Sequence, residues 1–164
     1  MASSFKDIKI KFLSIFPILL LFFISLNGSS SVDLIFFSVN IHYILVYFWV
    51  LRDPDNLGYG FIFISGLITD VILGFPLGIN ALSLLIIASV ASYVRNVTVR
   101  ITLINDWISF IPALIISNLI YLTSLYVSNF PVDYLYLIKN SIFTFIFYPI
   151  LWMLFSLILN FKKY

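Results

Sequence analysis

The sequence predicts an all-α integral membrane protein built as a bundle of six transmembrane helices. Hydrophobic residues make up 62% of the 164 residues and charged residues only 10%, whereas a soluble domain carries roughly 25% charged residues. The mean hydropathy of +1.12 comes from apolar blocks of about 15 to 25 residues, each long enough to cross a bilayer. Too little polar surface remains to cover a globule in water, so lipid is the expected solvent.

The first two expected helices are bounded by polar segments. Residues 11–26 form an apolar block that ends at an Asn-Gly-Ser-Ser-Ser cluster, residues 27–31, which breaks helices. Lysines precede this block, as in a signal peptide, but no small-residue cleavage site follows it, so we expect a retained helix. The second helix is expected over residues 32–51, and it ends at Arg52-Asp53-Pro54.

The third and fourth expected helices, residues 57–73 and 81–94, flank a turn that contains glycines and a proline. They are short, about 17 and 14 residues, or roughly 25 and 21 Å at 1.5 Å per residue. A re-entrant hairpin would also return both ends to one side of the membrane and stays open as an alternative. We favour two spans, because tilt and local thinning of the bilayer tolerate a modest mismatch.

The last two expected helices cover residues 107–127 and 136–161, with a short turn at 128–133 between them. Pro149 should kink the final helix, because proline lacks an N–H and its ring clashes with the preceding turn. No soluble insert or internal repeat interrupts the pattern. We therefore expect one transmembrane domain over residues 1–164.

The distribution of basic residues predicts the orientation, since Lys and Arg concentrate in cytoplasmic loops. Six crossings from a cytoplasmic N-terminus leave only Lys139 of the nine basic residues near the outer face. The other eight lie inside: Lys6, Lys9, Lys11, Arg52, Arg95, Arg100, Lys162 and Lys163. Both termini are therefore expected in the cytoplasm.

The most informative segment runs from Gly66 to Leu82 and is called the helical hairpin below. Gly66, Asp70 and Gly74 are four residues apart and fall on one helix face. Small residues on such a face let another helix approach closely in a membrane. The fourth helix offers a small pair of its own, Ala88 and Ser92, so we expect the third and fourth helices to pack tightly.

Asp70 is the one acidic residue that the pattern places clearly inside an apolar span. An ionisable group there is costly and is a functional candidate by default. A structural role is favoured over a ligand or partner contact, because the carboxylate can accept from unpaired amides near Asn80 to Leu82 at the start of the next helix. Both interpretations stay open.

The turn residues of the helical hairpin have expected roles of their own. Gly74 suits the end of a helix, where a left-handed backbone is common, and Pro76 suits a rigid turn. Gly78 can supply a positive φ, and Asn80 is expected to cap the fourth helix. These residues are candidates for structure or partner contact.

No catalytic apparatus is visible in the sequence. The chain has no cysteine and a single histidine, His42, so a thiolate or histidine metal site is excluded and a catalytic dyad is unfavourable. No phosphate-binding loop or paired carboxylates occur, and a net charge of +2 does not suit nucleic acid. We expect no cofactor, metal or enzyme activity.

The remaining polar and aromatic residues have expected structural roles. His42 and the apolar-block asparagines, Asn40, Asn118 and Asn140, are expected to hydrogen-bond between helices. Trp49 and Trp107 are interpreted as anchors at the membrane interface.

The helical hairpin resembles the signature of the MreD family, the rod shape-determining membrane proteins of bacteria. The residues that carry this resemblance are Gly66-Leu67-x-x-Asp70-x-x-x-Gly74-x-Pro76-Leu77-Gly78-x-x-Ala81-Leu82. Its surroundings are also similar: Trp49 and Pro54 before it, the Gly58 to Gly60 approach, Arg95 after it, and Tyr148-Pro149-x-x-Trp152 in the last helix.

The resemblance implies a non-enzymatic scaffold or regulator of the machinery that inserts peptidoglycan during rod elongation. The implied partners are MreC first, then the actin-like MreB, the glycosyltransferase RodA and a penicillin-binding transpeptidase, in the bacterial cytoplasmic (inner) membrane. The family's helical arrangement looks similar to the substrate-binding subunits of energy-coupling-factor transporters. This similarity leaves an alternative function, a small-molecule- or lipid-binding transporter subunit with a polar cavity lined by Asp70, Asn80 and Asn40.

Overall fold

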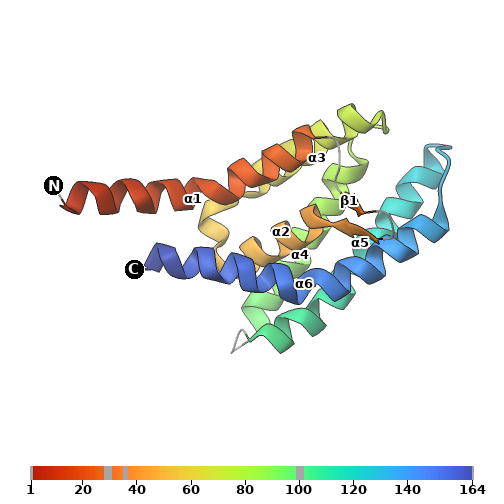
Figure 1. Cartoon of the computed structure of the whole chain (residues 1–164). Helices are drawn as coiled ribbons and strands as arrows, with labels where there is room; N and C mark the ends of the chain where they lie inside the picture. The colour runs from red at the N-terminus through yellow and green to blue at the C-terminus, as the bar shows by residue number, and fades with distance from the viewer. Residues whose placement is uncertain (1, 28–30, 35–36, 99–101, 164) are drawn as a thin grey trace.

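The computed structural model is an almost entirely helical protein (Figure 1). It describes residues 2–27, 31–34, 37–98 and 102–163, and side chains within 13–27, 38–98 and 102–161. The expected cluster at Gly28 to Ser30 and the basic Arg100 lie outside the described residues, and the lysines at both ends lie outside the described side chains. The elements are α1 (Ala2–Leu26), β1 (Ser31–Leu34), β2 (Phe37–Asn40), α2 (Ile41–Arg52), η1 (Pro54–Asn56), α3 (Tyr59–Leu73), α4 (Ile79–Val97), α5 (Leu103–Val127) and α6 (Tyr134–Lys163).

Three of the described helices are long and apolar enough to cross a membrane. They cover Ile79–Val97, Leu103–Val127 and Tyr134–Phe161, whereas the apolar parts of the other three helices, Leu13–Leu26, Ile41–Arg52 and Tyr59–Leu73, are shorter. Large hydrophobic side chains are exposed along the outer faces, for example Ile138, Ile142, Ile146 and Ile150 on α6. The expectation of an all-helical membrane protein is thus confirmed at this level.

The expected helix over residues 32–51 is wrong in its first part. Residues Ser31–Leu34 and Phe37–Asn40 instead pair as an antiparallel β-hairpin, with Ser31 opposite Asn40. The helix begins only at Ile41, because the Asn40 side chain caps it by accepting from the N–H of Tyr43 at 3.1 Å. A short apolar run does not distinguish a buried strand from a helix by periodicity alone.

The short helix α2 forms the centre of the molecule. All ten residues from His42 to Leu51 are buried, and the helix contacts α1, α4 and α6. Trp49 is only 1% exposed and packs against Phe155 at a ring-centroid distance of 6.2 Å. The interpretation of Trp49 as an interfacial anchor is therefore wrong, because α2 has no face left for lipid.

The remaining helices differ from the expected bounds mainly at their ends. Helix α4 has 19 residues, or about 28 Å, rather than the 14 expected, and α5 begins four residues early because the Thr102 side chain caps it. Residues 54–56 form a 3-10 turn, so α3 starts at Tyr59. Helix α6 continues through Pro149 as one helix of 30 residues.

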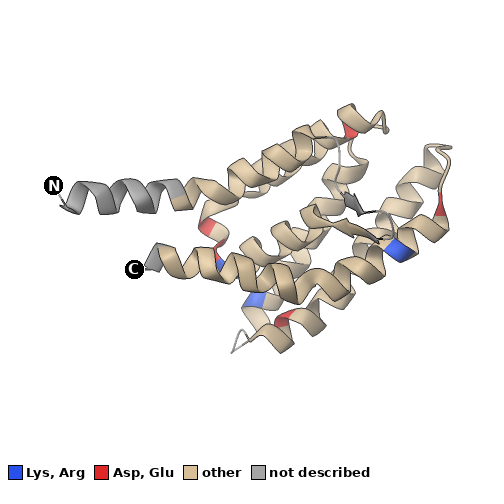
Figure 2. Cartoon of the chain, in the orientation of Figure 1, with Lys and Arg blue, Asp and Glu red and all other residues tan. Residues whose placement is uncertain are grey.

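The two ends of the bundle carry different parts of the chain. Both termini and the connection from α2 to α3 lie at one end, and the α3–α4 and α5–α6 turns lie at the opposite end (Figure 1). Charged residues lie mostly at or near helix ends and connections (Figure 2). The helical hairpin therefore presents its turn at the end away from the termini.

Candidate functional site

The centre of the helical hairpin is a fully buried carboxylate. Asp70, near the end of α3, is 0% exposed. One of its oxygens, Oδ2, accepts from the N–H of Gly78 at 2.8 Å, and Oδ1 accepts from the backbone N–H and the side-chain amide of Asn80 at 2.9 and 2.8 Å. We call these three hydrogen bonds the Asp70 cap.

The Asp70 cap supplies hydrogen-bond acceptors for N–H groups at the start of α4. The first N–H groups of a helix have no partner within the helix, and Gly78, its N-cap residue, has no side chain to supply one. A carboxylate from the neighbouring helix takes that place, where the helix dipole also favours negative charge. Asn80 was expected to be the capping residue, which is wrong: it lies inside α4 and donates to Asp70.

The turn of the helical hairpin depends on two glycines. Gly74 ends α3 with φ of +68°, and Gly78 precedes α4 with φ of +102°, a region that residues with a Cβ rarely adopt. The N–H of Phe75 donates to the carbonyl of Asp70 at 2.9 Å. The expected left-handed end at Gly74 and positive φ at Gly78 are therefore confirmed, and the half-buried Pro76 lies between them.

Helices α3 and α4 lie in close contact at Gly66. A Cβ placed on Gly66 would lie 2.3 Å from the Cα of Ala81 and 2.6 Å from its N. The residue of α4 that lies against Gly66 is thus Ala81. Ala88, of the small pair Ala88 and Ser92, belongs to the main core cluster together with Ile62 of α3, and Ser92 is partly buried.

A second buried carboxylate lies near the other end of the molecule. Asp106, in the first turn of α5, is 1% exposed and pairs with Arg52 of α2 at 2.8 Å. The indole N–H of Trp152 on α6 donates to the same carboxylate oxygen, Oδ2, at 2.9 Å. The Arg52 guanidinium also lies over the Trp152 ring, 5.0 Å from its centroid. The ion pair and the Trp152 hydrogen bond together connect α2, α5 and α6.

The sequence did not indicate this ion pair. Asp106 stands directly before the expected fifth helix, residues 107–127, and Arg52 directly after the expected second helix, residues 32–51. The expectation that Asp70 is the one acid inside an apolar span is wrong, because Asp106 is equally buried within α5. The two partners are 54 residues apart in sequence, and the available signal was weak: a Thr-x-x-x-Asp start to an apolar block.

The polar side chains of His42 and Asn118 bind neighbouring helices, as expected, whereas the Asn40 side chain caps its own helix α2. Ser25 of α1 lies 3.1 Å from Nε2 of His42, and the Asn118 amide donates to Ser141 at 2.7 Å. On α6, the side-chain amide of Asn140 donates to Ser38 of β2 at 2.6 Å. Thr144, one turn later, accepts from the backbone N–H of Asn40 at 2.8 Å. The β-hairpin is thereby fastened to α6.

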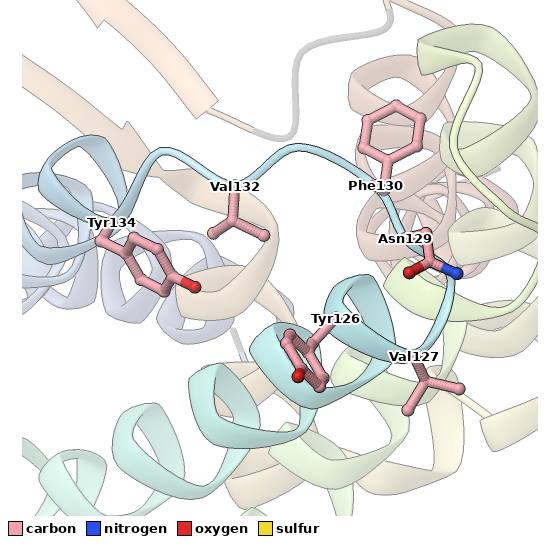
Figure 3. Close-up of a pocket in the computed structure, with 6 residues that line it drawn as sticks. All are labelled: Tyr126, Val127, Asn129, Phe130, Val132 and Tyr134. Atoms are coloured by element: carbon pink, nitrogen blue, oxygen red, sulfur yellow. The ribbon is translucent and has the colours of Figure 1, made fainter.

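Two shallow hollows lie at the end that carries the turns. One, of about 430 Å³, lies between the α3–α4 turn and the end of α5, beside Leu77, Gly78 and Ser124. The other, of about 390 Å³, is lined by Tyr126, Val127, Asn129, Phe130, Val132 and Tyr134 (Figure 3). Neither includes Asp70, Asn80 or Asn40, the residues expected to line a ligand cavity.

The second hollow has no charged lining. In Figure 3 the ring of Phe130 projects away from Tyr126, and it packs edge-on against Phe75 with centroids 5.0 Å apart.

Within the described ranges, no three residues among His, Asp and Glu are placed to hold a metal ion.

Comparisons of the chain with models of protein families, with curated proteins and with solved structures found no match.

Proposed function

We propose that the chain is a non-enzymatic membrane scaffold or regulator of the cell-wall elongation machinery in rod-shaped bacteria. In this proposal it binds MreC and helps to position peptidoglycan synthesis. MreB, RodA and a penicillin-binding transpeptidase are further partners, reached directly or through MreC. The proposal combines the resemblance of the helical hairpin to the MreD signature with the way that this hairpin is built.

The observation that carries the proposal is the Asp70 cap. Both carboxylate oxygens of Asp70 already accept hydrogen bonds from Gly78 and Asn80. The carboxylate is therefore used in interactions within the protein. A ligand or proton-transfer site needs polar groups directed at a cavity. An acid that caps a neighbouring helix instead has a structural role, which supports a scaffold function.

The proposed partner contact lies within the bilayer. Apart from the β-hairpin between α1 and α2, the connections between the described helices are short. Helix α3 exposes Phe61, Ile64 and Val71 on its outer side. Such a face suits the single membrane helix expected of MreC, because helices in lipid associate by close packing rather than by hydrophobic transfer. The helical hairpin would hold that face in place.

The proposed topology has six spans with both termini in the cytoplasm of a bacterial inner membrane. Helix α2 is only 12 residues long, or about 18 Å, and the β-hairpin before it adds to its length. Non-helical backbone is tolerated at membrane depth where protein buries it, and Ser38 and Asn40 meet α6 in this way.

The test is purification of the tagged chain from its native membrane in mild detergent, followed by mass spectrometry of everything retained. The proposal expects MreC and wall-synthesis enzymes with the wild-type chain and their loss with Gly66→Ala. The matched control is Gly60→Ala on the same helix, where a Cβ meets nothing within 4 Å. Recovery of a transporter ATPase, or of a stoichiometric small molecule without MreC, would instead favour the transporter-subunit function.

A further inference from the structure

Pro149 leaves one backbone carbonyl of α6 without its usual partner in the helix. In an α-helix each N–H donates to the carbonyl four residues earlier, and proline has no N–H to donate. The carbonyl that loses its donor at Pro149 is that of Phe145, and α6 still continues as one helix over Tyr134–Lys163. In a membrane such a carbonyl needs another donor, because the hydrocarbon region holds no water to supply one.

A side chain of α5 supplies the missing donor. The indole N–H of Trp107 donates to the carbonyl of Phe145 at 2.9 Å. The two rings also stack, with centroids 5.0 Å apart and planes 17° apart. Trp107 is partly buried, and the N–H of a buried tryptophan usually has a hydrogen-bond partner. An indole of the neighbouring helix thus replaces the amide N–H that Pro149 lacks.

The residue before Trp107 holds α6 on the other side of the proline. The carboxylate of Asp106 accepts from the indole N–H of Trp152 at 2.9 Å, and Trp152 lies three residues after Pro149. Adjacent residues in the first turn of α5 therefore bind α6 four residues before and three residues after its proline. Displacement of this single turn would release both hydrogen bonds together.

The two halves of α6 are attached to different parts of the molecule. Before Pro149, the side-chain amide of Asn140 donates to Ser38 of the β-hairpin at 2.6 Å. After Pro149, the ring of Trp152 packs edge-on against Phe48 of α2, with centroids 6.4 Å apart. Proline is a frequent site of sharp helix bends, of more than about 20°. The hydrogen bonds to α5 therefore hold together two halves that the proline would otherwise allow to change their angle.

We propose that Pro149 is a hinge in α6 and that Asp106 and Trp107 together form its latch. With the latch closed, the Trp107 indole completes the backbone hydrogen bonding of α6, and the helix continues through its proline. With the latch open, the Phe145 carbonyl loses its donor and α6 bends at Pro149, so that residues 150–163 move relative to the bundle. The end of the molecule that carries both termini (Figure 1) thus has a movable helix, whose position depends on the first turn of α5.

Two distances measured by electron paramagnetic resonance on the full chain in liposomes test the hinge. The chain has no cysteine, so introduced cysteines carry the spin labels without background. The hinge distance joins Tyr93→Cys on α4 to Leu157→Cys after the proline, and the reference distance joins Tyr93→Cys to Ile142→Cys before it, all at exposed positions. Leu157 lies eight residues beyond Pro149, or about 12 Å, so a bend of about 20° would move it by roughly 4 Å.

The latch is opened by combining Trp107→Phe with Trp152→Phe, which keeps an aromatic ring at both positions and removes both indole N–H groups. The expected result is a shift of the hinge distance by roughly 4 Å, the displacement of a bend of about 20°, with the reference distance unchanged. Pro149→Ala in the same background should return the hinge distance of the wild type, because alanine restores the N–H that bonds the Phe145 carbonyl.

Three other results would overturn the proposal. An unchanged hinge distance after removal of both indole N–H groups would show that α6 does not bend at its proline. A shift that persists when Pro149→Ala is added would mean that the two indoles act by packing rather than by replacing the missing N–H. A shift of both the hinge and the reference distance would show that the indoles hold the whole bundle together instead of one hinge.

Discussion

Gly66 of α3 and Ala81 of α4 lie in backbone contact: a Cβ on Gly66 would be 2.3 Å from the Cα of Ala81. One turn further along α3, on the same face, Asp70 caps the start of α4. The close approach and the cap support each other, because the carboxylate reaches the amides of Gly78 and Asn80 only when the two helices touch. In lipid, where hydrophobic transfer gives little drive for helix association, such packing matters more than in water.

Gly66→Ala should therefore destabilise the protein, by about 2 kcal/mol or more, since α3 and α4 must separate to admit one methyl group. Thermal unfolding of the purified chain in detergent measures the effect. Gly60→Ala is the matched control, because it adds the same methyl group to α3 in open space and alanine favours helix over glycine. Equal midpoints for the two variants would contradict the close approach.

The Asp70 cap predicts a graded series. Asp70→Ala leaves the backbone N–H groups of Gly78 and Asn80 and the Asn80 amide without their acceptor, and should cost about 3 kcal/mol or more. Asn80→Ala removes one donor while the carboxylate keeps its two backbone bonds, so its cost should be clearly smaller. Unfolding midpoints in the order wild type, Asn80→Ala, Asp70→Ala are expected. The reverse order of the two variants would show that Asn80, rather than Asp70, organises the turn.

Gly74→Leu separates backbone strain from crowding in the same turn. A Cβ at Gly74 meets nothing within 4 Å, and φ is +68°, so the cost comes from the left-handed backbone, about 1–2 kcal/mol. Gly74→Asn should restore most of the loss, because asparagine tolerates this region. Thermal midpoints of the two variants decide the point, and a Gly74→Asn variant as unstable as Gly74→Leu would speak against strain.

The sequence predicted what local signals determine. Helix breakers and caps at Gly74, Gly78 and Pro76 are local, so the turn of the helical hairpin and the positive φ values were predictable. The β-hairpin was not, because no glycine or proline separates residues 32–40 from the apolar block that follows them. Strand pairing also depends on α6, whose Asn140 and Thr144 hold β2 from about 100 residues away in sequence.

The ion pair between Arg52 and Asp106 shows the same limit for the candidate sites. Each residue taken alone looked like part of a polar loop, and only the packing of α2 against α5 and α6 brings them together. The hydrogen bond from Trp152 to Asp106 is likewise a tertiary contact. Contacts between residues that are distant in sequence cannot be predicted from the hydrophobic periodicity of a single chain.

Removing one partner of this ion pair should be worse than removing both. Arg52→Ala leaves the buried Asp106 carboxylate without its cation, with an expected cost of about 3–5 kcal/mol. The double variant Arg52→Ala/Asp106→Ala should recover part of that loss. A double-mutant cycle on thermal unfolding gives the coupling free energy, and strictly additive losses would mean that the pair contributes no interaction of its own.

Thr144 should fasten the β-hairpin to α6. Thr144→Val keeps the shape of the side chain but removes the hydroxyl that accepts from the Asn40 N–H at 2.8 Å, so a partly buried donor loses its partner at about 1 kcal/mol or more. Hydrogen exchange at the Asn40 amide should accelerate more than exchange in α4. Thr123→Val, at an exposed position of α5, serves as the control. Unchanged exchange at Asn40 would show that the strand is held by its partner strand alone.

The proposed topology predicts which side of the membrane each connection faces. The chain has no cysteine, so a single introduced cysteine reports its own position without background. Leu77→Cys and Asn129→Cys, exposed at the end with the turns, should react with an impermeant thiol reagent added outside intact spheroplasts. Asp55→Cys and Asn96→Cys, exposed in the η1 turn and near the end of α4, should react only after the membrane is opened.

The re-entrant alternative for the helical hairpin makes a different prediction at one position. If α3 and α4 entered the bilayer and returned without crossing it, Leu77→Cys would not react from outside, while Asn129→Cys still would. Six spans require both to react, because both turns lie at the same end of the bundle (Figure 1). Labelling of Asn129→Cys without Leu77→Cys would therefore reduce the count to four spans and place the turn of the helical hairpin inside the membrane.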